Sequence, residues 1–267
     1  MTTGRGPADD YLLGEIQQTY ELLAGWQRRG AQMPPEEPQR GSELDVDATV
    51  FPLFPPWRMA LISLLAAGEH LMIVRDTLAQ RQLYTSGTYT VIRGALVGAS
   101  QAVWALSPEG RDVRRDRGLA LIREMYTRLV QADEDHDPTL LTGAELAELA
   151  DQIEWLNKRR AALAAAMTTN VTINQTAIIT AAAEVVFKTP GKRQAVRSLW
   201  RQLSGDAHVL GWATFQRAEY RDQDPTTGLS TAVMTGGMPS TANAYIGAYR
   251  VLKVGWALFD QRGEAPG

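Results

Sequence analysis

The chain has 267 residues, of which 45% are hydrophobic and 21% are charged. This length and balance are typical of a globular protein with a sizeable core, and they exclude an intrinsically disordered chain. The lack of cysteine excludes disulfides, thiolate catalysis and cysteine-based metal or cluster sites. A formal net charge of −3 argues against nucleic-acid binding through bulk positive charge, although it leaves room for a local basic patch.

Residues 1–56 are predicted to form a helix followed by an arm. Apolar residues at three-four spacing predict a helix over 11–29. Residues 31–56 are rich in Pro, Glu, Asp and Gly, which favours an extended connector, and an apolar cluster at 50–54 would attach it to the body. Residues 1–10 lack an apolar core, so we expect no signal peptide.

The next two predicted helices are the most apolar part of the chain. The first covers 57–82, and its most apolar window, 59–74, contains Glu69 and His70 and is too short to span a bilayer comfortably. We therefore expect a soluble, cytoplasmic protein that does not contact a membrane. The second ends at 106 and has a slim side of Gly and Ala, which lets neighbours approach closely and places it at the centre of a bundle.

The following helix, predicted over 111–131, opens with four arginines. Positive charge at a helix N-terminus opposes the macrodipole, so these side chains are expected to meet acidic partners, an anionic ligand or solvent. A surface loop at 132–138 precedes Thr142 and Glu145, which match the capping-box pattern and start a helix to about residue 167. The four arginines are Arg111, Arg114, Arg115 and Arg117.

The last part of the chain is predicted to contain helices and a short hairpin. Helices are expected over 170–188 and from about residue 192 onward, and a final helix over 240–260 is followed by a frayed tail. Between them, 212–220 and 229–235 favour two short strands, with a helix continuing to about residue 221 as the alternative. The prediction is an all-α helical bundle with a possible short hairpin, organised as an N-terminal helix and arm (1–56) and a bundle domain (57–262).

The helix that starts near residue 192 carries the side chains most capable of chemistry. Arg201 and His208 are seven positions apart, nearly two turns, so both leave the same helix face. An arginine can hold a phosphate and a histidine can move a proton, which makes this pair the candidate catalytic residues. In the alternative, 204–206 break the helix, Asp206 caps the next turn, and His208 only forms a hydrogen bond to a neighbouring helix. The candidate binding residues between them are Gln202, Ser204 and Asp206.

Late in this helical chain, Arg201 is followed by six residues and then by His208. This spacing resembles the Arg-x4-6-His motif of the HEPN superfamily, a group of helical-bundle proteins many of which are ribonucleases. Segments 93–106 and 199–212 are also similar to uncharacterised actinobacterial helical proteins. The resemblance implies metal-independent RNA cleavage at a homodimer interface, without a cofactor. His208 would act as general base or acid on the ribose 2′-hydroxyl, and Arg201 would stabilise the pentavalent phosphate. An acidic residue on an earlier helix would be Glu69 or Glu124.

Three functional hypotheses follow, and the sequence leaves open whether the protein is an enzyme. The first is a HEPN-like ribonuclease, a toxin or defence component. The second is a non-enzymatic helical module that dimerises and binds a partner through the Arg201 and His208 surface or through the arm. The third is a carboxylate-histidine metal protein built on Glu69 and His70, although the Glu-x-x-His repeats of such sites are lacking. The remaining histidine, His136, lies among acids in a loop and is predicted to be solvated.

Overall fold

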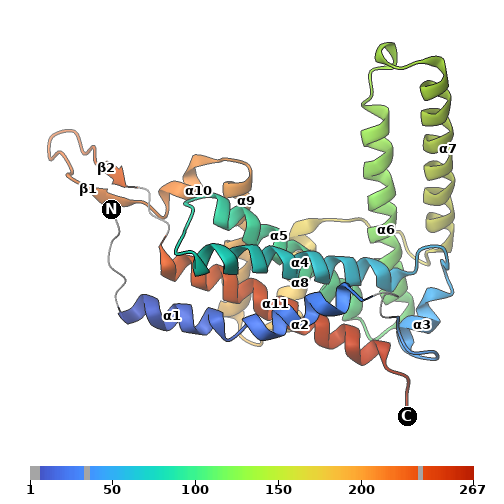
Figure 1. Ribbon diagram of the computed structural model, residues 1–267, viewed down its shortest axis with the longest axis horizontal. Helices are drawn as coiled ribbons and strands as arrows, with labels where there is room; N and C mark the ends of the chain where they lie inside the picture. Colours follow the sequence, from blue (N-terminus) through green and yellow to red (C-terminus); the bar gives the residue numbers. More distant parts are fainter. Residues whose placement is uncertain (1–6, 33–36, 234–236) are drawn as a thin grey trace. The chain divides into compact units, whose positions relative to one another are not determined.

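The computed structural model describes residues 7–32, 37–233 and 237–267. Helices make up 72% of it, and a two-stranded antiparallel hairpin lies near the C-terminus, so the predicted fold class is confirmed (Figure 1). Contacts divide the chain into two compact units, whereas the predicted boundary at 56/57 stays a prediction. Unit 1 comprises Met1–Glu37, Ile62–Val103 and Gln175–Leu258, and unit 2 comprises Pro38–Leu61, Trp104–Asn174 and Phe259–Gly267.

The elements follow one another as expected over most of the chain. In order they are α1 (Pro7–Gln17), α2 (Tyr20–Gly30), α3 (Glu43–Ala48), α4 (Pro56–Ala79), α5 (Gly87–Leu106), α6 (Arg111–Glu134), the 3-10 turn η1 (Pro138–Leu140), α7 (Gly143–Ala166), α8 (Gln175–Val186), α9 (Pro190–Ala207), α10 (Gly211–Phe215), β1 (Glu219–Arg221), β2 (Thr231–Val233) and α11 (Met238–Gly263).

The predicted helix over 11–29 is two helices, α1 and α2, because the chain breaks at Thr19. The Thr19 hydroxyl donates to the carbonyl oxygen of Ile16 at 2.7 Å and lies 2.9 Å from the Tyr245 hydroxyl of α11. A threonine hydroxyl that bonds to the backbone competes with the helical pattern. The partner that fixes Thr19 in this role lies 226 positions away in the sequence, which is why periodicity did not reveal the break.

The arm predicted over 31–56 is not extended throughout; that prediction was wrong for 43–48, which form α3. Ser42 starts this helix by accepting a hydrogen bond from the backbone N–H of Asp45 at 3.2 Å. The expected attachment by the cluster at 50–54 is confirmed, since Phe51 is buried in the core of unit 2. Residues 33–36 of the arm lie outside the described part of the chain.

The acids of α3 are the partners of the basic opening turn of α6, as one of the three alternatives predicted. The Arg114 side chain is buried and donates to Asp47 at 2.6 Å, and it also pairs with Glu43 at 2.7 Å. Arg111 donates to the same Asp47 at 3.2 Å. Buried charges need such partners, because an unpaired one carries a large desolvation penalty. Two acids of the arm, Glu43 and Asp47, are thus held in ion pairs with α6.

The same network fixes the C-terminus, where a frayed tail was predicted from residue 261. Helix α11 continues to Gly263, and the buried Arg262 pairs with Glu43 at 2.6 Å and Glu109 at 3.2 Å. Its Nε–H also donates to the Leu106 carbonyl at 2.6 Å. The prediction was wrong for 261–263, because a terminal arginine looks solvated unless its acidic partners, far away in the sequence, are known.

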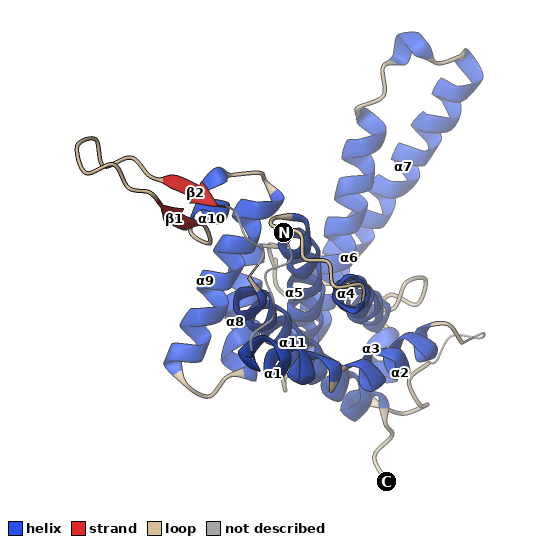
Figure 2. Ribbon diagram, turned by 60° about the vertical axis from the view of Figure 1, so that its left-hand side comes forward, coloured by secondary structure: helices blue, strands red, loops and turns tan. Residues whose placement is uncertain are grey.

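Helices α6 and α7 form an antiparallel hairpin in unit 2, and both views show them side by side (Figures 1 and 2). The predicted capping box is confirmed: Thr142 and Glu145 exchange hydrogen bonds at the start of α7. Between the helices lies an apolar core contributed by both of them and by Phe51. Its buried members are Phe51, Leu119, Ile122, Tyr126, Val130, Leu156 and Leu163.

The end of α7 is tied to α6 by one carboxylate. Asp116 accepts the backbone N–H groups of Thr168 and Thr169 at 2.9 and 2.8 Å, and their hydroxyls at 2.5 and 2.8 Å. Burial by itself raises the pKa of Asp116, but the four hydrogen bonds together outweigh it and hold the pKa below its ordinary value of 3.8. The ionised form of Asp116 therefore stabilises this unit.

The slim side of α5 packs as predicted in unit 1. Ala95 and Ala99 are fully buried, and a Cβ added at Gly98 would lie 2.5 Å from the carbonyl oxygen of Ser63 in α4. At Gly94 the imidazole of His70 fills the equivalent space, 2.5 Å from where a Cβ would be. Residues with small or no side chains therefore allow α4 and α5 to approach closely.

Helix α4 is long and apolar enough to cross a membrane by length and composition, the one described helix that meets this test. The expectation that its apolar window is too short does not hold for the whole 24-residue helix. Length and composition are weak evidence, because core helices of soluble proteins meet the same test. Leu64, Leu71 and Leu78 of this helix are buried within unit 1.

After α9 the chain forms α10 and then the hairpin. Strand β1 pairs with β2 in antiparallel register, with Tyr220 opposite Ala232. Strands are thus present within both predicted ranges, 212–220 and 229–235; the first is shorter than predicted, because residues 211–215 are helical, and the second begins at Thr231. The alternative of a continuous helix to residue 221 was wrong. Residues 234–236 lie outside the described part of the chain.

Two glycine substitutions, one where α4 and α5 approach closely and one in open space, should have opposite effects on stability. Gly98→Ala should destabilise the protein by about 1–3 kcal/mol, because the new methyl group meets backbone that cannot yield locally. Gly14→Ala, in α1 with nothing within 4 Å of a Cβ, should instead stabilise it by about 0.5–1 kcal/mol through helix propensity. Urea unfolding followed by circular dichroism measures both, and equal effects would contradict the packing.

The lowered pKa of Asp116 predicts a pH dependence. The stabilisation is fully present above the ordinary pKa of 3.8 and is lost as pH falls through the lower folded value. At pH 7, Asp116→Asn should reduce the free energy of unfolding by about 1–3 kcal/mol. Below about pH 4 the difference between wild type and variant should narrow. Unfolding measured from pH 7 to pH 2 checks this, and a constant difference would refute the role of the ionised carboxylate.

Candidate functional site

Helix α9 is continuous through the segment where a break was considered. Pro190 stands at its start, a position that tolerates the missing N–H. Gly205 is buried within the helix, and a Cβ there would lie 2.8 Å from the Cβ of Ala213 and 2.9 Å from the Trp212 ring. The glycine therefore serves close packing with α10. The interpretation of 204–206 as a helix break with an Asp206 cap was wrong.

The helix ends at Ala207 with His208 as its C-cap, and the chain turns sharply after it. Val209 adopts a φ of 56°, a left-handed conformation that a β-branched residue rarely takes. Two hydrogen bonds hold the turn: the Val209 N–H donates to the Asp206 carbonyl at 3.0 Å, and the Leu210 N–H to the Gly205 carbonyl at 2.8 Å. Leu210, which follows the turn, is half exposed. This turn brings α10 back against the end of α9.

Asp206 is a structural residue. Its buried carboxylate accepts two hydrogen bonds from the guanidinium of Arg217, one of them at 3.0 Å. Arg217 also donates to the Thr85 carbonyl at 3.2 Å and lies 3.9 Å above the centre of the Tyr89 ring. The expectation that Asp206 binds or orients a ligand beside His208 is not met, because the side chain does not line that pocket.

Arg201 and His208 line one pocket of about 610 Å³, which we call the Arg201 pocket. Gln202 and Ser204, two of the predicted binding residues, line it as well. Both candidate catalytic side chains are exposed, and neither makes a side-chain hydrogen bond or ion pair with any described residue. A guanidinium and an imidazole that share a pocket and have no partner in the described part of the chain are available to a ligand.

Arg93 adds a third cation beside this pocket, and sequence reasoning did not identify it. It comes from α5, where its guanidinium lies 4.8 Å above the centre of the Trp200 ring and its Nε 3.4 Å from the Ser204 hydroxyl. Trp200 and Ser204 both line the Arg201 pocket. The available signal was a single arginine in an otherwise apolar helix, since such residues are rarely buried without a partner.

The surface of α9 is basic although the whole chain is acidic. The helix carries four basic residues against one acid, Asp206, whose charge is neutralised by Arg217. Arg193 caps α8 by donating to the Phe187 carbonyl at 2.8 Å, and Arg197 donates to Gln194 at 2.6 Å. No described acid pairs with these cations. The basic residues of α9 are Lys192, Arg193, Arg197 and Arg201.

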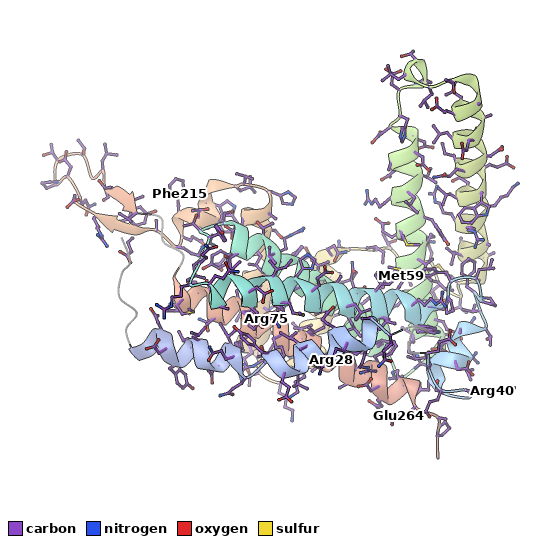
Figure 3. The ribbon with its side chains drawn as sticks, in the orientation of Figure 1. Arg28, Arg40, Met59, Arg75, Phe215 and Glu264 are labelled. Atoms are coloured by element: carbon purple, nitrogen blue, oxygen red, sulfur yellow. The ribbon has the colours of Figure 1, made fainter. Side chains whose placement is uncertain are left out.

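Exposed aromatic side chains follow directly after α9. Trp212 lines the Arg201 pocket and is 43% exposed, Phe215 is 50% exposed, and Tyr220 on β1 is 61% exposed. Figure 3 marks Phe215 on α10. Three exposed aromatic rings thus lie within nine positions of the chain. The sequence pattern had assigned them to strands or to a core.

The other candidate residues lie elsewhere. The Nδ1 of His70 lies 2.6 Å from the Ala66 carbonyl, one turn earlier, while Glu69 is exposed. Among the described residues no three His, Asp or Glu side chains gather as metal ligands, so nothing completes a site around this pair. Glu124 pairs with Arg128 on the surface of unit 2. His136 is exposed, as predicted.

The buried pair predicts that Asp206 matters for folding. Asp206→Ala should reduce the free energy of unfolding by about 3–5 kcal/mol, because it leaves the Arg217 guanidinium buried without its counter-charge. Ser204→Ala, two positions earlier, should change it by at most about 0.5–1.5 kcal/mol. A double variant, Asp206→Leu with Arg217→Met, should recover part of the loss. Urea unfolding compares the three, and an unchanged Asp206→Ala stability would contradict the assignment.

Comparison with known proteins leaves the site to be judged on its own geometry. No protein-family model, no curated protein and no solved structure matches the chain.

Proposed function

We propose that this protein is a HEPN-like, metal-independent endoribonuclease with its reaction centre in the Arg201 pocket. The observation that carries the proposal is that Arg201 and His208 have exposed side chains in one pocket and make no side-chain hydrogen bond or ion pair with any described residue. Their spacing along α9 provides one group that can bind a phosphate and one that can accept or donate a proton. We further propose a cytoplasmic protein, a toxin or defence component, without a membrane partner.

The surroundings of the pocket fit a single-stranded nucleic acid. Basic side chains of α9 would contact backbone phosphates, whose affinity for proteins rests on clustered Lys and Arg. The exposed rings of Trp212, Phe215 and Tyr220 offer flat surfaces on which unpaired bases can stack. Stacking of this kind requires bases that are not already paired, so single-stranded RNA is the better substrate than duplex.

The proposed reaction is an internal transesterification. His208 removes the proton from a ribose 2′-hydroxyl, the 2′-oxygen forms a bond to phosphorus, and the bond from phosphorus to the 5′-oxygen breaks. Arg201 donates hydrogen bonds to the phosphate oxygens as negative charge develops there. A proton passes to the leaving 5′-oxygen, which gives a 2′,3′-cyclic phosphate and a 5′-hydroxyl. In the proposed homodimer, His208 of the other copy donates this proton.

A second candidate function is a non-enzymatic module that dimerises and binds RNA or another anionic partner. The Arg201 pocket of one chain contains a single imidazole among its described lining residues, whereas the proposed reaction moves two protons. A chain that does not dimerise would keep the basic and aromatic surface but lack an acid for the leaving group. RNA binding without cleavage is the outcome that favours this alternative.

The test uses synthetic single-stranded RNA in excess EDTA. Wild type should cleave it to products with 2′,3′-cyclic phosphate ends, and His208→Ala should lower the rate by about 10²–10⁴-fold. Arg201→Ala should lower it by roughly 10²–10³-fold through loss of charge stabilisation. His136→Ala is the matched control, because it removes an exposed histidine from unit 2. No cleavage, or equal cleavage by wild type and His208→Ala, would end the proposal.

A further inference from the structure

A second cavity, of about 690 Å³, adjoins the Arg201 pocket in unit 1; we call it the Arg250 cleft. The two hollows share Ser198, Gln202 and Gln216 among their lining residues. The Gln202 side chain donates to the Gln216 side chain at 3.1 Å, so a pair of amides forms their common boundary. The two hollows therefore lie next to each other on unit 1.

Cations outnumber acids on the walls of the Arg250 cleft. Lys192 and Arg250 are exposed and have no acidic partner among the described residues, and Glu15 is the single acid among the described lining residues. Arg217 also lines the cleft; its side chain is nine-tenths buried, and its Nε–H has no acceptor among the described residues. A buried donor without an acceptor is unusual in a folded protein. These features favour an anionic ligand.

The other walls of the cleft are apolar. Phe187, Val196 and Leu203 are buried and line it, together with the ring of Tyr89. Gly247 of α11 also lines it, and its missing side chain leaves room beside Leu199, whose Cδ2 would be 3.3 Å from an added Cβ. Cations facing an apolar and aromatic wall suit a ligand that has both an anionic group and a flat, weakly polar ring. The volume lies within the range of small-molecule sites.

We infer that the Arg250 cleft binds one nucleoside monophosphate unit, with its phosphate at Lys192 and Arg250 and its base against the apolar wall. The inference rests on the proposed function, because the nucleotide bound in the Arg250 cleft would be the next one along the RNA from the nucleotide in the Arg201 pocket. A free nucleotide and a nucleotide within a chain carry the same recognised groups. The amide pair of Gln202 and Gln216 then lies beside the phosphate that joins the two nucleotides.

Binding is measured by calorimetry with three probes: uridine 5′-monophosphate, the DNA trinucleotide of thymidine and inorganic phosphate. The DNA probe lacks the 2′-hydroxyl and is not cut. Wild type should bind the trinucleotide more tightly than the mononucleotide, and inorganic phosphate most weakly. Arg250→Ala and Lys192→Ala should each weaken mononucleotide binding about tenfold or more. Arg28→Ala, which removes an exposed arginine of α2 in the same unit (Figure 3), should leave it within about twofold.

The outcomes separate this inference from the proposed function. Mononucleotide binding that is lost in Arg250→Ala supports the subsite even if RNA is never cleaved. Mononucleotide binding that is absent, or unaffected by both Arg250→Ala and Lys192→Ala, overturns the subsite even if RNA is cleaved. Tight binding of inorganic phosphate alone also overturns it, since the apolar wall would then contribute nothing. Where RNA is cleaved, Arg250→Ala should raise KM about tenfold and leave kcat within about twofold.

Discussion

The buried contact between Asp206 and Arg217 is the interaction on which the candidate site depends. It joins the last turn of α9 to the segment after α10, and Arg217 extends the connection to the Thr85 carbonyl and the Tyr89 ring. Removing two charges from water is unfavourable unless the geometry is good, and here a two-point contact, a carbonyl and an aromatic face compensate. Arg217 lines the Arg250 cleft, while Gly205 and Ser204, next to Asp206, line the Arg201 pocket. The ion pair of Asp206 and Arg217 thus positions residues that line both the Arg201 pocket and the Arg250 cleft.

The distribution of charge explains how a chain with a net charge of −3 can present a basic surface. In unit 2, Asp47 pairs with two arginines, and Asp116 accepts hydrogen bonds from two threonines. On α9 the single acid is neutralised by Arg217, which leaves the remaining cations without counter-charges on that helix. Net charge therefore says little about local binding, because pairing decides which charges face a ligand. The Arg201 pocket and the Arg250 cleft are both lined by cations that have no acidic partner among the described residues.

Local patterns predicted most elements because their causes lie within a few residues. The capping box of Thr142 and Glu145, the slim side of α5 and the turn between the strands are of this kind. The failures have distant causes. Thr19 breaks a periodic helix because Tyr245 holds its hydroxyl, and the acid-rich arm forms α3 beside arginines of α6. A pattern of acids and prolines does not distinguish a solvated connector from a segment that ion pairs fix in place.

The sequence by itself determined the helical class, most helix positions, and the presence of Arg201 and His208 on one face of a single helix. That follows from a fixed helical repeat, which places residues seven apart nearly in line. Only the tertiary structure decided that Gly205 continues the helix, that Asp206 is buried with Arg217, and that Arg93, Trp212 and the Arg250 cleft surround the pair. These features depend on contacts between elements far apart in the chain, and such contacts leave no periodic signal in the residues that make them.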